Sequence, residues 1–523
     1  MSVHRGVTGC IVTLGLGASL LGGCSTLPSL DKRSTSTALL DTDTTRLGRA
    51  IAPRVDAHPG NSGIYPLPDG RDAFAARALL AQAAERTLDA QYYIWHKDMT
   101  GTLLFEALHA AADRGVRVRL LLDDRPTSGL DTTLAALDAH PNIEVRLFNP
   151  FVIRQPRALG FITDFSRANR RMHNKSFTAD NQVTIIGGRN VGDEYFDATG
   201  GFVFVDLDVM AVGPVVKDVS KDFDRYWASG SSYPVDRLLP PADPALIAEL
   251  ASAASLIERD PAAAAYMEAL RHFPFVRELI EGRLPLEWAP TRMVSDDPAK
   301  GLGLALPKAL LLQKLKTIIG EPATEMALVS AYFVPAAAGT EAFADLAERG
   351  VNVTVLTNSL EATDVAPVHA GYAKRRKSLL EAGVTLYELR RLSPDTGANK
   401  RAALVGSSGS SGSSASGLHA KTFAVDRSCV FIGSFNFDPR SAKLNTEMGF
   451  VIDSPALAQQ IAAAFDSSIP ANAYEVRLSD SGGVYWIERR EGKWLRHDTE
   501  PGTSLWQRAG VWFLSLLPIE WLL

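Results

Sequence analysis

Two short segments of the 523-residue chain carry histidine, lysine and aspartate at the same spacing. The first segment holds His173, Lys175 and Asp180, and the second holds His419, Lys421 and Asp426. Asparagine follows each histidine at an equal offset, as Asn190 in one segment and Asn436 in the other. One match to this pattern arises by chance in roughly one chain in a few tens. Two matches with equal flanking offsets therefore indicate an internal repeat with a chemical purpose.

An imidazole, an ammonium and an amide from each half suit a phosphodiester, whose negative charge builds up in the transition state. One neutral histidine attacks phosphorus while a second, protonated one donates to the departing alkoxide. The expected intermediate is a covalent phosphohistidine, which an alcohol or water then resolves. No metal or other cofactor is expected, because lysines and amides neutralise the oxygens and His-x-Lys is a poor ligand spacing.

The spacing also predicts how strands would position these groups. Side chains two apart on a strand share a face, so each histidine is expected to project together with its lysine. Asp180 and Asp426 lie an odd number of residues further on, so they are predicted to be structural. The next strand ends in Gly187 and Gly188 in one half and in Gly433 and Ser434 in the other. Each is expected to run back beside the histidine strand and to place the asparagine amide at the same opening of the site.

A strand, a helix and a strand over residues 91–124 recur over 330–359, with Asp-Arg-Gly-Val in the first copy and Glu-Arg-Gly-Val in the second. β-Branched runs alternate with helical periods in both copies. This pattern predicts an α/β fold of two pseudo-symmetric halves, each a mixed β-sheet flanked by helices. One active site is expected at the interface of the halves.

The N-terminus has an apolar stretch followed by small residues, which is typical of a secretory signal. Leu21-Gly22-Gly23-Cys24 resembles a bacterial lipobox. The resemblance implies a lipidated Cys24 and a tether to the periplasmic face of the inner or outer membrane. An uncleaved membrane anchor is the alternative.

Composition shifts divide the chain further. The predicted parts are a signal peptide (1–23), a tether (24–60), a first half (61–239), a helical linker or insert (240–285), a second half (286–480) and a C-terminal hairpin with an apolar helix (481–523). The last helix is interrupted by Pro518 and predicts an interfacial or pocket-capping element, with packing on the core as the alternative.

The paired HxKxxxxD segments with GGRN and GSFN resemble the phospholipase D superfamily. RMHNKSF, NQVTIIGGRNVGDEYF, GSFNFDPRSAKLNTEMGF and LPIEWLL further resemble bacterial cardiolipin synthases of the C type, over residues 60–523. The resemblance implies an acidic residue behind each histidine, which is Glu447 in the second half and Asp206, with Asp208 in reserve, in the first. It also implies that His173 is the nucleophile and His419 the acid, although the near symmetry of the halves leaves the reverse assignment open.

The activity that the resemblance implies is a phosphatidyl transfer that makes cardiolipin from phosphatidylglycerol. The donor would be phosphatidylethanolamine or a second phosphatidylglycerol. A formal charge of −5 gives no global basic field, which favours membrane phospholipids over nucleic acid as partners. The alternatives are a hydrolytic phospholipase D that releases phosphatidic acid, a nuclease or phosphodiesterase, and a non-catalytic envelope lipoprotein. The oligomeric state and any helper protein stay open.

A Ser/Gly run at 406–417 ends just before His419. It is predicted to be a flexible insertion in the second half, either a surface loop or a lid over the site. Shortening residues 406–416 should leave folding intact, and only a lid would change turnover or the ratio of transfer to hydrolysis.

Overall fold

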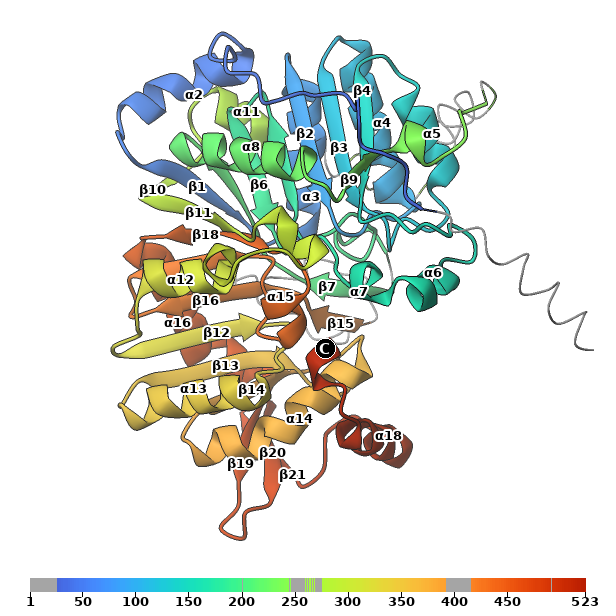
Figure 1. The fold of residues 1–523 in the computed structure, drawn as a ribbon. Coiled ribbons are helices and arrows are strands. Elements are labelled where there is room, and N and C mark those ends of the chain that lie inside the picture. Colours follow the sequence, from blue (N-terminus) through green and yellow to red (C-terminus); the bar gives the residue numbers. More distant parts are fainter. Residues whose placement is uncertain are drawn as a thin grey trace, which may run out of the picture.

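The computed structural model describes residues 26–199, 201–243, 275–391, 415–490 and 492–523, together with isolated positions between 245 and 268. Within these residues the chain forms two lobes, one above the other in Figure 1, each built on one large β-sheet. The predicted signal peptide, Cys24, most of the helical linker at 240–285 and most of the Ser/Gly insertion lie outside the described residues.

The first lobe contains a nine-stranded mixed sheet. Its strands are β1 (Ser62–Leu67), β2 (Thr87–Tyr92), β3 (Arg117–Asp123), β4 (Ile143–Phe148), β5 (Ser176–Ala179), β6 (Val183–Gly187), β8 (Asp208–Val212), β9 (Ser232–Pro234) and β10 (Glu287–Ala289). They lie in the order β10-β1-β8-β6-β5-β2-β3-β4-β9. The parallel strands β2, β3 and β4 are connected by α4 (Met99–Asp113) and α5 (Asp131–Asp138), whereas the other neighbours are antiparallel.

The second lobe repeats this plan in a ten-stranded sheet. Its strands are β11 (Thr291–Ser295), β12 (Glu325–Ser330), β13 (Asn352–Asn358), β14 (Thr385–Leu389), β16 (Lys421–Val425), β17 (Cys429–Gly433), β18 (Met448–Ile452), β19 (Ala473–Leu478), β20 (Val484–Arg490) and β21 (Lys493–His497). The order β11-β18-β17-β16-β12-β13-β14 matches β1-β8-β6-β5-β2-β3-β4 strand for strand. Helices α13 (Ala336–Glu348) and α14 (Ala366–Glu381) connect the parallel strands. The predicted two-half α/β fold is therefore confirmed.

Further helices cover the sheets and connect their strands. They are α2 (Arg46–Asp56), α3 (Gly70–Ala83), α6 (Arg157–Thr163), α7 (Phe165–Ala168), α8 (Pro214–Trp227), α11 (Phe275–Ile280), α12 (Leu311–Ile319), α15 (Pro439–Lys443), α16 (Pro455–Asp466), α17 (Ser468–Asn472) and α18 (Leu505–Leu516). Short 3₁₀ turns lie at η1 (Val235–Arg237), η2 (Pro298–Leu302), η3 (Pro307–Ala309) and η4 (Glu520–Leu522).

The repeated Arg-Gly-Val sequence ends corresponding helices in the same way. Gly115 and Gly350 follow α4 and α13 with φ angles of 91° and 86°, a left-handed conformation that glycine adopts without strain. The next residue closes the helix in each copy. Val116 N donates to Ala111 O at 3.1 Å, and Val351 N donates to Leu346 O at 3.0 Å. The same local sequence thus turns each chain segment from a helix into the next parallel strand.

The two lobes share an apolar interior. Ile186 of β6 and Val209 of β8 belong to the same buried cluster as Ile432 of β17 and Phe450 of β18. Backbone pairing adds a second connection, since β7 (Phe202–Val205) of the first lobe runs parallel to β15 (Ala415–Leu418) of the second. A site at this junction therefore rests on side chains and backbone from both lobes.

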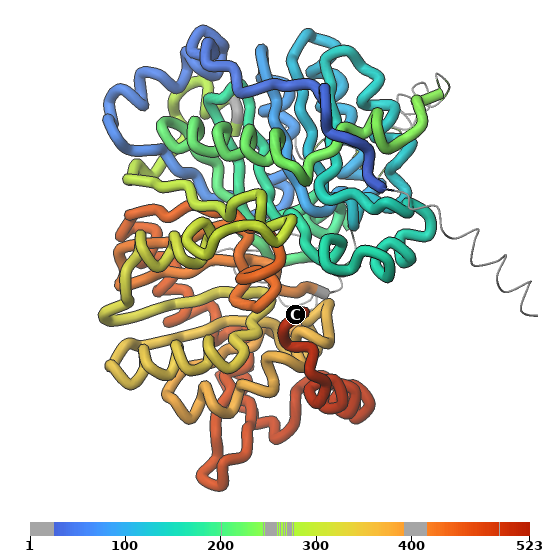
Figure 2. The backbone as a smooth tube through the Cα atoms, viewed as in Figure 1, coloured from blue at the N-terminus to red at the C-terminus, as the bar shows by residue number. Residues whose placement is uncertain are grey.

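Two structural features lie at the predicted boundaries. The described part of the predicted tether lies along the first lobe, as the dark blue N-terminal segment in Figure 2 shows. Leu47 and Ile51 give α2 an apolar face that is buried in the first core, and Arg119 donates to Ser36 O at 3.0 Å. In addition, β10 pairs with β1, so the first sheet extends beyond residue 286.

The C-terminal segment packs on the second lobe. The β20–β21 hairpin extends the sheet, and α18 lies against α14 with Val511 buried between them. Beneath this contact Arg376 of α14 forms buried ion pairs with Glu388 and Glu500. Within the described part of the chain, no helix combines the length and apolar character that a bilayer crossing requires.

Candidate active site

Each motif histidine contacts a carboxylate that comes from the opposite lobe. His173 Nδ1 lies 2.9 Å from Glu447 Oε2, which comes from the second lobe. His419 Nδ1 lies 2.5 Å from Asp206 Oδ2, which comes from the first lobe. The histidines are only 7% and 5% exposed. Because each carboxylate occupies Nδ1, Nε2 is the ring nitrogen left for chemistry in both halves.

Each histidine lies just ahead of its strand rather than on it, which differs from the predicted strand placement. His173 N donates to Thr446 O at 2.9 Å, and His419 N donates to Val205 O at 2.8 Å. These backbone bonds cross between the lobes. The opposite lobe therefore holds the main chain of each histidine as well as its ring.

The motif lysines lie with their histidines. Lys175 Nζ donates to His173 O at 2.6 Å, and Lys421 Nζ donates to His419 O. Burial lowers the pKa of both lysines. Their ammonium groups place positive charge where phosphate oxygens would lie during the proposed reaction.

The two asparagines occupy equivalent positions. Asn190 Oδ1 accepts from Ile94 N at 3.1 Å, and Asn436 Oδ1 accepts from Tyr332 N at 3.3 Å. The backbone thus fixes the oxygen of each amide. Asn190 Nδ2 is buried with no acceptor in hydrogen-bond geometry among the described residues. A buried donor of this kind is expected to be satisfied by a substrate oxygen.

The electrostatics of the two histidine–carboxylate pairs differ. Burial, followed by the charges of Lys175 and Lys421, lowers the pKa of His173 well below its ordinary value. Burial and then Lys421 lower the pKa of His419 to about 4. Burial alone would raise the pKa of Asp206, but the charges of His419 and Lys421 lower it below its ordinary value. Burial dominates at Glu447 and raises its pKa to about 7. Asp206 is therefore the firmly ionised carboxylate of the two.

Serine side chains position Glu447. Ser434 Oγ donates to Glu447 Oε2 at 2.5 Å, and Ser441 Oγ donates to Oε1 at 2.9 Å. Asp438 caps α15 by accepting from Ser441 N at 2.6 Å. Ser441 is not among the site residues predicted from the sequence. The Asp-Pro-x-Ser capping signal at 438–441 locates the helix start, but it does not reveal the carboxylate partner.

Gly188 corresponds to Ser434 in the other half, and the missing side chain leaves space for the Asp206 carboxylate. A Cβ atom at Gly188 would lie 2.1 Å from Asp206 Oδ1. Asp206 Oδ1 instead accepts from Leu207 N at 2.8 Å. The first half therefore makes room for its carboxylate, whereas the second half adds a hydroxyl to bind one.

Aromatic rings line both histidines and were also missed from sequence. The Tyr93 ring lies edge-on to His173 with centroids 5.1 Å apart. Tyr195 and Phe204 lie 5.3 Å and 5.0 Å from the His419 ring. These contacts exclude water from the imidazoles and restrict their rotation.

Asp208, the reserve candidate for the first-half acid, has a structural position. Its Oδ2 lies 2.8 Å from Arg77 NH2 in a buried ion pair, and its Oδ1 accepts from Arg189 N at 3.1 Å. The structure thus brings Asp206, and not Asp208, to a histidine.

The motif aspartates lie away from the histidines, at hairpin turns. Asp180 has a φ angle of 51° and accepts backbone hydrogen bonds from Glu85, Arg86 and Thr87. Asp426 also has a φ angle of 51° and binds the backbone of Ala323, Thr324 and Glu325 in the same way. Each aspartate thus connects its hairpin turn to the backbone at the start of the adjacent strand, β2 in the first lobe and β12 in the second.

Asp180→Ala is expected to lower the free energy of unfolding by about 2 kcal/mol, because the buried Thr87 N and the part-buried Glu85 N and Arg86 N lose their acceptor. Chemical denaturation measures this loss. The turnover of the folded variant should stay near the wild-type value at low temperature. A large loss of turnover in a variant of unchanged stability would instead assign Asp180 to the chemistry.

Glu447→Gln is expected to remove a pH dependence of stability. The pKa of Glu447 lies at about 7 in the folded chain against an ordinary 4.5, so the folded chain holds an extra proton between these values. The stabilisation is full below pH 4.5 and is lost as the pH rises through 7. The free energy of unfolding of the wild type relative to the variant should therefore fall by about 3 kcal/mol between pH 4.5 and 8. A constant difference across this range, measured by chemical denaturation, would contradict the raised pKa.

A bilobed α/β fold with one histidine, lysine and asparagine set from each lobe defines a phospholipase D-like protein. The family model described as "Cardiolipin synthase, PLD-like domain" matches residues 77–227 and 315–469, and the chain belongs to this family. It is 52% identical to cardiolipin synthase C of Escherichia coli K12 over 91% of this chain and 100% of that protein. It is 23% identical to cardiolipin synthase B of the same strain, over 79% of this chain and 82% of that one.

A solved structure shows a related fold. The phosphatidylserine synthase of Haemophilus influenzae Rd KW20 matches with a TM-score of 0.56, over 92% of this chain and 100% of that chain, at 13% identity. The similarity extends over both lobes and supports the two-half architecture.

Proposed function

We propose that the protein is a phosphatidyltransferase that makes cardiolipin from phosphatidylglycerol and a phospholipid donor. The observation that carries this proposal is the crossed pair of histidines, each with Nδ1 on a carboxylate and Nε2 available. Membership of the cardiolipin synthase family and the 52% identity to cardiolipin synthase C support a phospholipid substrate. The donor is phosphatidylethanolamine or a second phosphatidylglycerol.

In the first step His173 Nε2 attacks the donor phosphorus. A P–N bond forms as the P–O bond to the headgroup alcohol breaks, and His419 Nε2 gives its proton to the departing oxygen. The phosphatidyl group is then held on His173. Lys175, Lys421 and the Asn190 amide stabilise the negative oxygens of the transition state.

In the second step the acceptor alcohol takes the phosphatidyl group from His173, and His419 acts as the base. A glycerol hydroxyl of phosphatidylglycerol attacks phosphorus and passes its proton to His419 Nε2, and the P–N bond breaks to leave neutral His173. The product is cardiolipin, and the headgroup alcohol of the donor is the by-product.

The contrast between the carboxylates supports these roles. The pKa of His419 is about 4 in the free site, because burial and Lys421 outweigh Asp206. An anionic donor phosphate beside the ring raises that pKa, and the ionised Asp206 stabilises the protonated ring that results. Glu447, with its raised pKa, gives less support to a charged His173 and so leaves it neutral for attack. This contrast supports the proposal that His173 is the nucleophile and that His419 is the acid and then the base.

Purified protein with labelled phosphatidylglycerol, with and without phosphatidylethanolamine, tests the proposal. Labelled cardiolipin is the expected product. Phosphatidic acid without cardiolipin in both mixtures would replace the proposal with a hydrolytic phospholipase D. Cleavage of nucleic acid without any lipid product would replace it with a nuclease.

We also propose that Cys24 is lipidated and holds the protein at the periplasmic face of the inner or outer membrane. The lipobox-like sequence before Cys24 supports this attachment. Mass spectrometry of the N-terminal peptide should find a diacylglyceryl group on Cys24. An unmodified N-terminus that still begins at residue 1 would contradict the attachment.

A further inference from the structure

We infer that α18 and the α6–α7 segment form one docking face for a bilayer that contains anionic phospholipid, and that this face directs the site toward its substrate. The inference rests on the proposed function, because it supplies the surface from which phospholipids would enter. The face is made of exposed side chains from both lobes and does not include the histidines.

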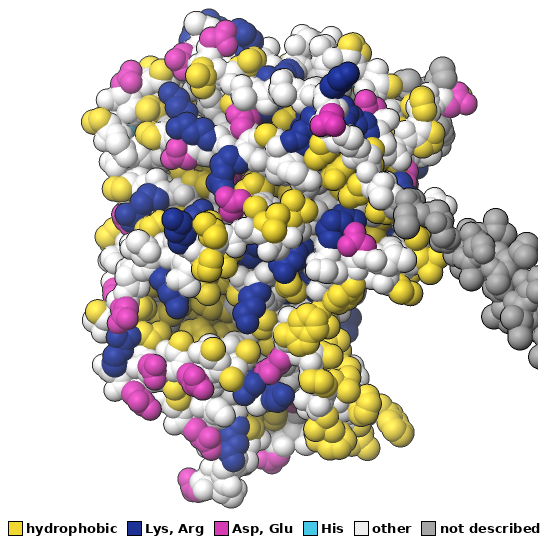
Figure 3. Space-filling view, in the orientation of Figure 1, with side chains coloured by type: hydrophobic (Ala, Val, Ile, Leu, Met, Phe, Trp, Pro, Cys, Tyr) yellow, Lys and Arg dark blue, Asp and Glu magenta, His cyan; other side chains and the backbone are white. Residues whose placement is uncertain are grey.

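Helix α18 presents apolar side chains to solvent. Trp506 is 84% exposed, Trp512 65%, Phe513 59% and Leu516 61%. The helix is held against α14 through Val511, so its orientation leaves these side chains outward. Figure 3 shows a hydrophobic surface at the lower right of the molecule, where Figure 1 places α18. Tryptophan and phenylalanine in such a position are typical of helices that lie in a membrane interface.

Helix α6 of the other lobe presents a second apolar surface. Ile162 is 79% exposed and Leu159 45%. The segment lies on the same side of the molecule as α18, between the lobes in Figure 1. Apolar side chains that are exposed on two lobes and on one side of the molecule indicate a single broad contact rather than two unrelated patches.

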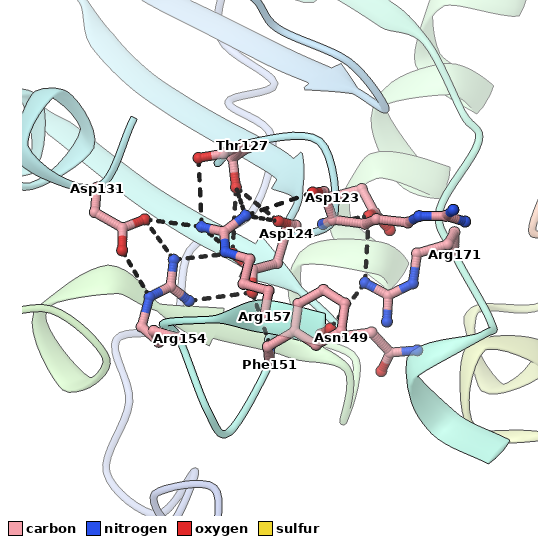
Figure 4. Close-up of polar contacts among 10 residues, drawn as sticks. Asp123, Asp124, Thr127, Asp131, Asn149, Phe151, Arg154, Arg157 and Arg171 are labelled. Carbon is pink, nitrogen blue, oxygen red and sulfur yellow. Dashed lines mark hydrogen bonds and ion pairs between the residues drawn. The ribbon is translucent and has the colours of Figure 1, made fainter. Parts of the chain in front are cut away.

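An ion-pair cluster fixes the base of α6. Arg154 binds Asp124 at 3.0 Å and Asp131 at 2.5 Å, and Arg157 binds Asp131 at 3.0 Å. Figure 4 shows both guanidinium groups between these carboxylates. The cluster holds α6 on its inner side, which keeps Ile162 outward in a fixed place.

Arg440 connects the two surfaces next to the site. Its side chain donates to Asn169 O at 3.0 Å, directly after α7, and to Leu522 O at 2.9 Å, after α18. Arg440 also lies on α15, whose Ser441 binds Glu447. The junction of the two surfaces is therefore one short helix away from the carboxylate that orients His173.

Charge favours an anionic lipid surface over a second protein copy. Arg125 packs on Phe161 of α6 at 5.2 Å, and Arg508 lies on α18. Neither arginine forms an ion pair within the described ranges of the chain. Arg125 beside the apolar surface of α6 and Arg508 on the tryptophan-bearing α18 complement the anionic headgroup of phosphatidylglycerol, which is also the proposed acceptor.

Tryptophan quenching in vesicles of phosphatidylglycerol with brominated acyl chains tests the inference on the full-length protein. Quenching is expected in the wild type and should be largely lost in a Trp506→Phe, Trp512→Phe variant. Trp288→Phe is the matched control, since Trp288 stacks on His58 and belongs to β10, which lies on the other side of the molecule from α18 in Figure 1, so that quenching should stay unchanged. Ile162→Glu should weaken vesicle partitioning by ~10-fold or more. Because quenching is read at named tryptophans, an N-terminal tether does not produce the difference between variants.

Equal quenching in the wild type and the double variant would overturn the inference. So would light scattering that finds a dimer which Ile162→Glu dissociates, because a second copy would then cover the face. Cardiolipin formation from detergent-dispersed lipids separates this inference from the proposed function. Product without tryptophan quenching would overturn only the docking face, whereas quenching without cardiolipin in any mixture would overturn only the transferase.

Discussion

His173→Ala is expected to lower the rate of cardiolipin formation by at least ~10⁴-fold, because the P–N bond has no other place to form. The measurement is the initial rate with labelled phosphatidylglycerol and donor. The change removes one buried ring and its contact with Glu447, so the unfolding temperature must be measured in parallel. His58→Ala is the matched control, since His58 stacks on Trp288 and hydrogen-bonds to Arg54 O of α2, and it should keep the wild-type rate. A folded His173→Ala variant that keeps a rate within about tenfold of the wild type would remove His173 from the chemistry.

His419→Ala is expected to lower the rate with a natural donor by roughly 10³-fold, because the alkoxide leaves without a proton. A phosphatidyl p-nitrophenyl ester changes this result, since nitrophenolate leaves without help from an acid. The variant should therefore release one burst of nitrophenol per chain and then stop, because no base remains to activate the acceptor. His173→Ala should show no burst. A burst from His173→Ala and none from His419→Ala would reverse the two roles.

The repeat, the fold class and the paired motifs could be predicted from the sequence because their signals are local. The helix stops at Gly115 and Gly350 and the turns at Asp180 and Asp426 each lie within a few residues of the pattern that encodes them. The two-half α/β architecture follows from the order of such local elements.

The crossed partners of the histidines could not be predicted in this way. His173 and Glu447 are 274 residues apart, and His419 and Asp206 are 213 apart, so only the packing of one lobe on the other brings them together. The resemblance already placed Asp206 ahead of Asp208, and the structure supplies the physical reason, because Arg77 of α3 binds Asp208.

The packing of the described part of residues 24–60 on the first lobe also could not be predicted from composition. The segment is polar and contains proline and glycine, which favours a spacer, but Leu47 and Ile51 of α2 find a place in the first core. The sequence of a short amphipathic helix does not reveal whether the folded protein offers a surface against which its apolar face can pack.

The most direct test of the account locates the covalent intermediate. The His419→Ala variant is mixed with the activated phosphatidyl ester, denatured at alkaline pH after the burst, digested and analysed by mass spectrometry. A phosphatidyl group is expected on the peptide that contains His173, and none is expected on peptides from the wild type after cardiolipin has formed. A phosphatidyl group on another residue, or product formation by the wild type with no adduct in the variant, would contradict transfer through His173.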